Sequence, residues 1–342
     1  MGRFIIRRFI GMLAVLLVVS LITFGLMHAV PGGPFDREKP LPAATIALLN
    51  EKYNLDAPLF EQYLDYIGDI IGPRLTYGRI PPSQSEDYLI NVELPFITNE
   101  EGQGAAVRWI NFGPTYSSRS LSVNDRFREN LPISFQLGMA AFAVALVIGL
   151  PSGIIAALNR NSGLDYLSMS IALIGVSVPV IVTAPVLQYI FSVQLRILPV
   201  TGWGTLQQMI LPSLALGFAN SAIVARLTRA SILQVLNEDF IRTARAKGLS
   251  ERIVVIVHVL KNSLIPIVTV MGPLFAALVT GTFVVETVFG IPGMGRFFVT
   301  SIQSRDYPVI MGTVLLYAGF LVAANTFVDV LYAWIDPRIR LD

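Results

Sequence analysis

Long apolar runs are the feature that most constrains what this chain can form. A helix rises about 1.5 Å per residue, so about 20 mostly apolar residues are needed to cross roughly 30 Å of hydrocarbon. Six runs reach that length: Phe9–Val30, Ile133–Leu158, Tyr166–Val193, Met209–Leu227, Leu264–Phe289 and Val309–Trp334. We therefore predict an all-α polytopic membrane protein with six transmembrane helices.

The composition supports this class and excludes several kinds of site. Charged residues make up 14% of the chain and hydrophobic residues 54%, whereas a soluble domain carries roughly 25% charged residues. Cysteine is absent, which excludes disulfides, thiolate metal sites and cysteine nucleophiles. With only His28 and His258, no HExxH motif and no supported Ser-His-Asp set, we predict neither a metal site nor an enzyme activity.

The positions of lysine and arginine predict the orientation, because short cytoplasmic loops are enriched in these residues. One side of the six spans, which includes both termini, holds most of them: Arg3, Arg7, Arg8, Arg160, Arg226, Arg229, Arg242, Arg245, Lys247, Arg252, Lys261, Arg338 and Arg340. The short loops of the other side have only Arg196, Arg296 and Arg305. Both termini are therefore predicted to be cytoplasmic. A cleaved signal peptide is disfavoured, because the first apolar run exceeds an h-region of about 7–15 residues.

Residues 31–132 follow the first span and are therefore predicted to form a large insert outside the cytoplasm. The insert carries nine basic and fourteen acidic residues. Helices are expected within NEKYNLDAPLFEQYLDYIGDII, where Asn54 or Asp56 would cap the second helix and one face would hold Leu59, Tyr63, Tyr66, Ile67 and Ile70. The segments GPRLTYGRIPPSQSEDYL and NEEGQGAA are predicted as loop, and short strands are expected within Val92–Ile110.

The loop between the fourth and fifth predicted spans, residues 237–263, is the most basic segment of the chain. Its sequence predicts a short helix from Glu238 to Lys247. Asn237 is a good N-cap for this helix, and Gly248 is placed to end it. A positive cytoplasmic loop needs only lysine and arginine in any order, so the signals for a defined helix indicate a role beyond membrane orientation.

Two further features limit what this role can be: a second short helix and a narrow apolar face on the first. Ser250 is expected to cap a helix that begins near Glu251, and Phe240, Ile241 and Ala244 form the apolar face of the first helix. A nucleic-acid site would need more basic charge and stacking aromatics, and a helix in lipid headgroups would need a wider apolar face. Docking on a cytosolic protein fits best, with an ordinary positive loop as the alternative.

The segment EDFIRTARAKGLSERIVVIVHVLKNSLIP resembles the cytoplasmic EAA-type loop of binding-protein-dependent ABC importer permeases. It is most similar to the oligopeptide/dipeptide branch, in the subunit with the long outer loop. The motif positions hold Arg242, Thr243, Ala244 and Gly248, so the general Glu is replaced. The segments NFGPTYSSRSLSVNDRFRENLPISFQLG, ETVFGIPGMGRFF, SRDYPVIMG and IDPRIRL extend the resemblance to nearly the whole chain. The stretch from about Leu75 to Ala106 departs from it and looks like an insertion.

This resemblance implies a type I ABC importer permease (MetI-like) with a large extracytoplasmic insert. Its parts would be residues 1–30 as N-terminal tail and first span, 31–132 as insert, 133–334 as core and 335–342 as cytoplasmic tail. The implied location is the bacterial cytoplasmic (inner) membrane. The implied partners are a homologous second permease, two cytosolic ABC ATPase subunits and an extracytoplasmic solute-binding protein, and no nucleic acid.

The chain has no Walker motif, so the resemblance implies that ATP and Mg are bound by the ATPase subunits and that this chain carries no cofactor. Peptides are the expected cargo, with nickel, glutathione or oligosaccharides as alternatives within the same class. An ATP-independent secondary transporter would show inverted repeats and carboxylates at the midplane, and the sequence shows neither. A membrane scaffold without transport activity is the remaining alternative.

Three sets of candidate site residues follow. ATPase coupling is assigned to Asp239, Phe240, Arg242, Thr243, Ala244, Lys247 and Gly248. The polar residues predicted for the translocation path are Gln136, Asn220 and Ser221, with helix–helix hydrogen bonding as an equal alternative. The glycine-rich GIPGMGR segment lacks the spacing of a phosphate loop, and the predicted outer gate is Glu286, Gly290, Pro292 and Gly293. For Glu286 and for Asp329, a structural ion pair or a solvated position is expected.

Overall fold

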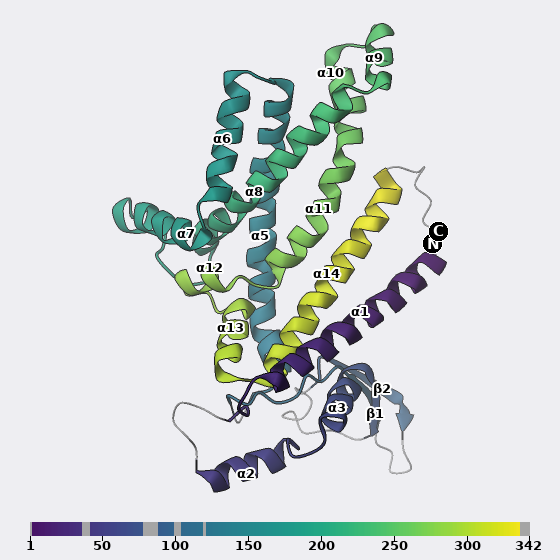
Figure 1. The fold of residues 1–342 in the computed structure, drawn as a ribbon, viewed down its shortest axis with the longest axis vertical. Coiled ribbons are helices and arrows are strands. Elements are labelled where there is room, and N and C mark those ends of the chain that lie inside the picture. The colour runs from purple at the N-terminus through teal and green to yellow at the C-terminus, as the bar shows by residue number, and fades with distance from the viewer. Residues whose placement is uncertain (1, 36–41, 78–87, 99–103, 119–120, 336–342) are drawn as a thin grey trace. The chain divides into compact units, whose positions relative to one another are not determined.

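The computed structural model describes residues 2–35, 42–77, 88–98, 104–118 and 121–335, which divide into two compact units (Figure 1). The helical unit lies within residues 1–12, 133–296 and 319–342, and the α/β unit lies within residues 13–132 and 297–318. The helices that contribute to both are α1 (Gly2–Ala29), α5 (Val123–Leu158), α13 (Met294–Ser304) and α14 (Tyr307–Ile335).

Helix α8 (Leu206–Leu236) is the central element of the helical unit. It begins with a capping box, in which Thr205 and Gln208 each bind the backbone N–H of the other. It packs against α6, α7 and α11. The other elements are α6 (Gly163–Ser177), α7 (Val180–Gln188), the π-helical turn η1 (Tyr189–Gln194), α9 (Asp239–Ala246), α10 (Glu251–Ile253), the π-helical segment η2 (Val254–Leu260), α11 (Lys261–Val279) and α12 (Phe283–Val288).

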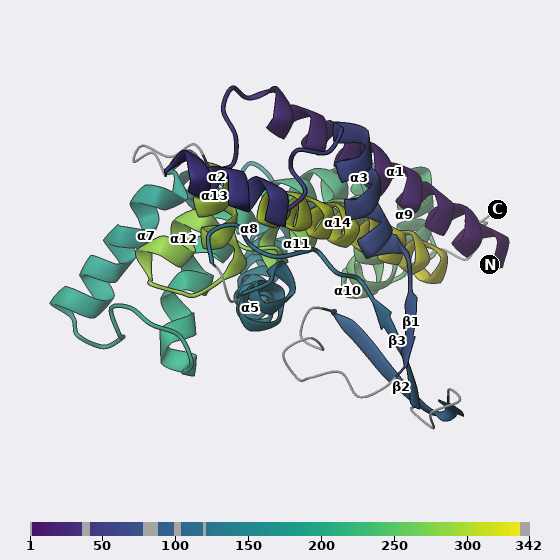
Figure 2. The same cartoon turned by 90° about the horizontal axis from the view of Figure 1, so that it is seen from below.

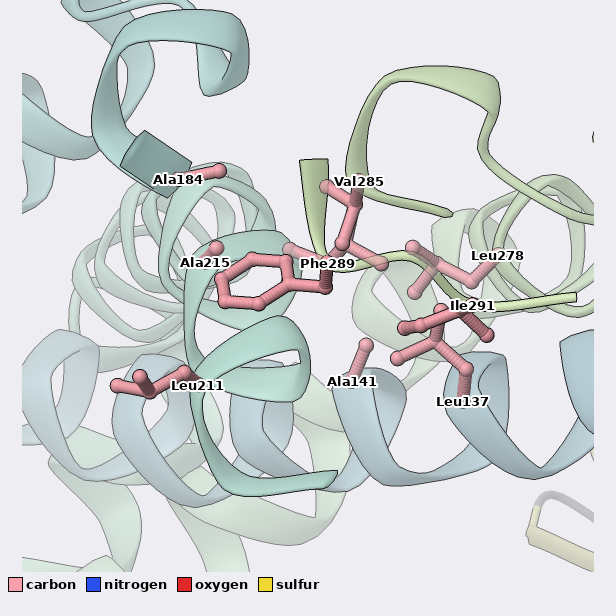
Figure 3. Close-up of a cluster of buried hydrophobic side chains, with 10 residues drawn as sticks. Leu137, Ala141, Ala184, Leu211, Ala215, Leu278, Val285, Phe289 and Ile291 are labelled. Carbon is pink, nitrogen blue, oxygen red and sulfur yellow. The ribbon is translucent and has the colours of Figure 1, made fainter. Parts of the chain in front are cut away.

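A cluster of buried apolar side chains forms the core of the helical unit (Figure 3). It consists of Leu137, Ala141, Ala184, Leu211, Ala215, Leu216, Leu278, Val285, Phe289 and Ile291. Glycines bring α5 and α8 together beside it. A Cβ on Gly217 would lie 2.6 Å from the carbonyl oxygen of Ala141, and a Cβ on Gly153 would lie 2.5 Å from that of Ala225. Such close backbone approach is a typical source of helix association in lipid.

The described residues contain five helical segments that are long and apolar enough to cross a membrane: Ile6–Ala29, Val123–Leu158, Leu206–Leu236, Glu251–Val288 and Tyr307–Leu331. The predicted span Tyr166–Val193 is not one straight helix, because α6 and the α7–η1 segment meet at an angle of 102°. Pro179 explains the bend, since proline lacks an N–H and disfavours the helical conformation at Val178. The prediction of six spans holds only if the bent pair counts as one crossing.

The α/β unit contains a three-stranded antiparallel sheet, so the all-α prediction is wrong for this part of the chain. The strands β1 (Arg74–Tyr77), β3 (Gly104–Trp109) and β2 (Ile90–Thr98) lie in that order (Figure 2). The expected strands are β2 and β3, whereas β1 and the start of β3 lie in segments predicted as loop. Thr76 and Tyr77 pair with Ala106 and Ala105, so pairing with a distant strand decides their conformation rather than local propensity.

Two helices precede the sheet, as the sequence predicts: α2 (Ala43–Lys52) and α3 (Leu59–Ile71). Their details differ from the prediction, because Pro58 is the N-cap residue of α3 and neither expected residue caps it. On the predicted apolar face, Tyr63 is buried and its hydroxyl lies 2.8 Å from the Ser20 hydroxyl, whereas Leu59 is 52% exposed. The predicted loop residues 78–87 and 99–103 and the predicted tail residues 336–342 lie outside the described residues.

Candidate functional site

Helix α9 (Asp239–Ala246) lies at the end of α8 and is the structural counterpart of the predicted docking helix (Figure 1). Glu238, not Asn237, is its N-cap residue. Asn237 instead ends α8, where its backbone N–H donates to the Gln234 carbonyl at 3.1 Å. The chain therefore passes from one helix to the other without a loop, which ties the position of α9 to that of α8.

One face of α9 is buried in the helical unit. Ile241 is fully buried and Ala244 is nearly so, in a cluster with Ile232 of α8 and with Val254 and Val259 of η2. Apolar contacts of this kind hold a short helix that would not be stable alone. The buried face therefore anchors α9 to both α8 and the segment that leads into α11.

The other face of α9 is exposed. Phe240 is 42% exposed, so its predicted place on the apolar face with Ile241 is wrong. The remaining candidate coupling residues on this surface are exposed as well: Asp239, Arg242, Thr243 and Lys247. An exposed aromatic ring between charged side chains is the composition expected where a partner protein docks.

The turn after α9 is set by Gly248, which ends the helix as predicted. Its φ of 78° is in the left-handed region that favours glycine, and its N–H donates to the Arg245 carbonyl at 2.9 Å. Across this turn Arg245 forms two hydrogen bonds to the Glu251 carboxylate, at 2.7 and 3.3 Å. Both side chains are largely exposed, so the pair contributes little stability. Its main effect is to favour this conformation of the turn.

Glu286 of α12 is fully buried, which rules out the solvated position expected for it. Its carboxylate accepts hydrogen bonds from the Ser134 hydroxyl at 2.8 Å, from the Thr282 N–H at 3.2 Å and from the Arg296 N–H at 3.0 Å. The Ser134 oxygen in turn accepts from the Met294 N–H at 2.7 Å. A carboxylate with this many donors is stabilised without a paired cation.

The glycines around Glu286 make this enclosure possible. A Cβ on Gly293 would lie 2.6 Å from the Ser134 hydroxyl oxygen, and a Cβ on Gly281 would lie 2.5 Å from the Gly295 nitrogen. Gly281 has a φ of 106°, which also requires glycine. Of the other predicted gate residues, Gly290 and Pro292 are exposed, so they lie on the outer surface of residues 281–296, which we call the Glu286 hairpin.

The three residues predicted for the translocation path have separate surroundings. Asn220 donates to the Leu216 carbonyl at 2.8 Å and Ser221 donates to the Phe218 carbonyl at 2.7 Å, so both bind the backbone of their own helix. Ser221 is buried, and Gln136 of α5 is exposed. The path assignment stays a prediction.

Two further ion pairs lie in the helical unit. Asp329 pairs with Arg8, as expected for a structural ion pair. Arg229 of α8 binds both oxygens of the buried Asp165 of α6, at 2.7 and 2.8 Å. This pair and Ser134 are not singled out by the sequence. Asp165 directly precedes the predicted span Tyr166–Val193 and Arg229 follows the span that ends at Leu227, so neither residue stands out within an apolar run. Among the described residues, no group of three His, Asp or Glu side chains could hold a metal ion.

Two family models match the chain. The model described as binding-protein-dependent transport system inner membrane component matches residues 149–341, and its N-terminal counterpart matches residues 1–81. The first match includes α9 and the Glu286 hairpin, so both features lie inside the shared region.

Curated relatives match from end to end. The chain is 41% identical over 341 residues to the dipeptide transport system permease protein DppB of Bacillus subtilis, covering 100% of this chain and 99% of that protein. It is 38% identical over 342 residues to the oligopeptide transport system permease protein OppB of Haemophilus influenzae, covering 99% and 100%. The expectation that residues 75–106 are an insertion stays a prediction.

A solved structure shares part of this fold. A chain of the MetNI methionine ABC transporter in an inward-facing conformation matches with a TM-score of 0.50 at 19% identity, covering 62% of this chain and 96% of that chain. At this identity the likeness concerns the fold alone. It shows that part of this chain has the helical fold of that protein.

Proposed function

Because the chain belongs to the inner membrane components of binding-protein-dependent transport systems, we propose that it is the permease subunit of an ATP-driven importer for oligopeptides or dipeptides. The observation that carries the proposal is the end-to-end similarity to two proteins named as peptide permeases. The apolar helices and the family make the chain a multi-pass protein of the inner membrane.

The proposed assembly has four further protein subunits, and it lies in the lipid bilayer. A homologous permease forms the translocation path with this chain, two ABC ATPases bind on the cytoplasmic side, and a solute-binding protein delivers substrate from outside. Both termini and α9 are cytoplasmic in this arrangement, and residues 31–132 are extracytoplasmic. ATP and Mg are bound by the ATPase subunits, since this chain has no nucleotide-binding motif.

In the proposed mechanism, α9 transmits the motion of the ATPases. Its exposed face, with Phe240, Arg242 and Thr243, docks in a groove of one ATPase subunit. Its buried face moves with α8 and η2, because Ile241 packs against side chains of both. Closure of the ATPase dimer on ATP is thereby carried into the helices that line the path. The transporter alternates between two states, and ATP shifts their populations because it binds one state better.

The Glu286 hairpin has a different proposed role, as a rigid turn at the outer mouth. Its carboxylate is bound from α5, from Thr282 at the N-cap of α12 and from the start of α13. Movement of α5 or of α13 relative to α12 would break a buried hydrogen bond. The hairpin is therefore expected to move as one body when the outer gate opens and closes.

The experiment that tests this function is purification through a tag on this chain, followed by reconstitution with the binding protein in proteoliposomes. Uptake of labelled dialanine and trialanine is measured with and without ATP. The proposal predicts that two ATPase subunits and a second permease co-purify, and that uptake requires ATP and the binding protein.

The alternatives predict different results in the same assay. Uptake of Ni²⁺, glutathione or maltotriose in place of peptides would contradict the cargo and retain the importer class. Peptide uptake that needs an ion gradient and no ATP would contradict the importer class. Purification without any ATPase would favour a scaffold.

A further inference from the structure

The α/β unit contains a partly open cavity that the proposed transport mechanism does not use. Its volume is about 310 Å³, and its lining comes from α1, from the turn after α2, from α3, from the segment 112–116 and from the start of α14. Cavities of this size are at the lower end of small-molecule sites. All of these segments belong to one unit.

Aromatic rings in mutual contact form one wall of the cavity. The ring of Phe24 lies 4.2 Å from that of His28, which lies 5.1 Å from Tyr307; Tyr307 lies 6.4 Å from Tyr116, which lies 4.7 Å from Tyr53. Asp306 holds Tyr116 in place by accepting its backbone N–H at 3.1 Å. The faces of such rings attract cations, and Lys52 provides an example, because its Nζ lies 5.1 Å from the Tyr53 ring centroid.

Helix α3 forms the polar wall. Gln62, Asp65, Tyr66 and Asp69 line the cavity, at the three- and four-residue spacings of one helix face. The side-chain amide of Gln62 already donates hydrogen bonds to the Leu55 and Ala57 carbonyls, and Asp69 forms an ion pair with Arg74. Among the residues that the structure describes, Asp65 forms no ion pair.

The hydroxyl of Tyr66 is the group that needs a partner. It is buried and has no hydrogen-bond partner within the described part of the chain, and an unmatched buried polar group is costly. Burial raises the pKa of this hydroxyl well above its usual range, so it is a neutral group with a free acceptor oxygen. A ligand in the cavity would satisfy it.

We propose that this cavity binds a small organic ammonium ligand with an aromatic or apolar body. The ammonium donates to the Tyr66 hydroxyl oxygen and to the Asp65 carboxylate, and the rings of Tyr53 and Tyr116 face its charge. The body of the ligand fills the apolar part of the cavity beside Met27 and Phe112. The one exposed cation of the lining, Lys52, competes with the ligand for the same aromatic wall.

The test uses the purified full chain in lipid nanodiscs and three probes that share a phenyl group on a short alkyl chain. These are phenethylamine, 2-phenylethanol and 3-phenylpropanoate, which are a cation, a neutral molecule and an anion at pH 7. Binding is measured by saturation-transfer NMR. The cation is expected to bind saturably and about tenfold more tightly than either of the others. Equal binding of the three probes would overturn the proposal.

Two substitutions assign the site. Tyr66→Phe is expected to weaken phenethylamine binding about tenfold and to leave the melting temperature of the unliganded chain unchanged or higher, because the lost hydroxyl has no partner. Asp65→Asn is expected to weaken binding by a similar factor. The matched controls are Tyr77→Phe on β1 and Glu61→Gln on α3, which lie outside the cavity lining. Unchanged affinity in both Tyr66→Phe and Asp65→Asn would contradict the assignment.

A third substitution and a second ligand source sharpen the test. Lys52→Gln is expected to tighten phenethylamine binding about threefold, because it removes a competing charge. The dipeptide Phe-Ala is compared with its N-acetyl form, since a free amino terminus is one source of the ammonium. This extension rests on the proposed function, but binding is read on the isolated chain, so its failure is distinct from a failure of ATP-driven uptake. Equally tight binding of the acetylated dipeptide would also contradict ammonium recognition.

Discussion

Helix α9 and the Glu286 hairpin are both polar segments joined to apolar helices, yet they use their polar groups in opposite ways. In the hairpin the polar groups are buried: the Glu286 carboxylate accepts hydrogen bonds from Ser134 of α5 and from two backbone N–H groups. Helix α9 turns its apolar residues inward and leaves Phe240 and Arg242 exposed. The first arrangement is complete within the chain, whereas the second has an exposed surface available for a partner. Substitutions in the hairpin should therefore alter stability, and substitutions on the exposed face of α9 should alter coupling.

Gly293→Ala should have the largest effect, because the new methyl group would overlap the Ser134 hydroxyl and the Glu286 carboxylate. We expect a loss of about 3 kcal/mol in the free energy of unfolding, measured by SDS-induced unfolding in mixed micelles. Gly319→Ala is the matched control, since a Cβ there has open space around it. Equal stability of the two variants would show that the hairpin is not closed around Glu286.

Ser134→Ala removes both the hydrogen bond to Glu286 and the acceptor for the Met294 N–H. A loss of about 2.5 kcal/mol is expected, because a buried charge and a buried N–H each lose a partner. The control is Ser152→Ala, whose hydroxyl binds only the Ile148 carbonyl of its own helix. If Ser134→Ala and Ser152→Ala lower the unfolding free energy equally, the hydrogen bonds of Ser134 to Glu286 and Met294 add no extra stability.

Ala244→Glu tests the buried face of α9. Ala244 is 6% exposed within an apolar cluster, so a carboxylate there should cost about 2 kcal/mol of unfolding free energy. Arg242→Glu on the exposed face is the control, and it should leave the unfolding free energy unchanged while impairing uptake. Unchanged stability in Ala244→Glu would mean that α9 is not anchored as the structure has it.

The smallest effect is expected for Glu251→Gln, which removes one partner of the exposed pair with Arg245. Such pairs contribute about 0.5 kcal/mol or less. The change should be visible as faster hydrogen exchange in α9, and the global unfolding free energy should stay within error. A global loss above about 1 kcal/mol would show that the Gly248 turn, and not the buried face, holds the helix.

The sequence predicts the features that depend on neighbouring residues. Gly248 ends α9 as expected, because a glycine directly after a helical pattern is a local signal for the end of a helix. Ser134 and Glu286 are 152 residues apart in sequence, and Asp165 and Arg229 are 64 apart, so no local pattern pairs them. Likewise Tyr77 becomes a strand residue only because it meets Ala105. The features that the sequence did not predict are contacts between residues that lie far apart in the chain.

Site-directed crosslinking can show whether the exposed face of α9 contacts an ATPase subunit. The chain has no cysteine, so Thr243→Cys introduces a single attachment point for a benzophenone maleimide on that face. Arg160→Cys, at an exposed position in the turn between α5 and α6, is the control. The account predicts that the Thr243→Cys variant crosslinks to the co-purified ATPase and that the control does not. Absence of that crosslink in an assembled complex, or equal crosslinking from both positions, would contradict it.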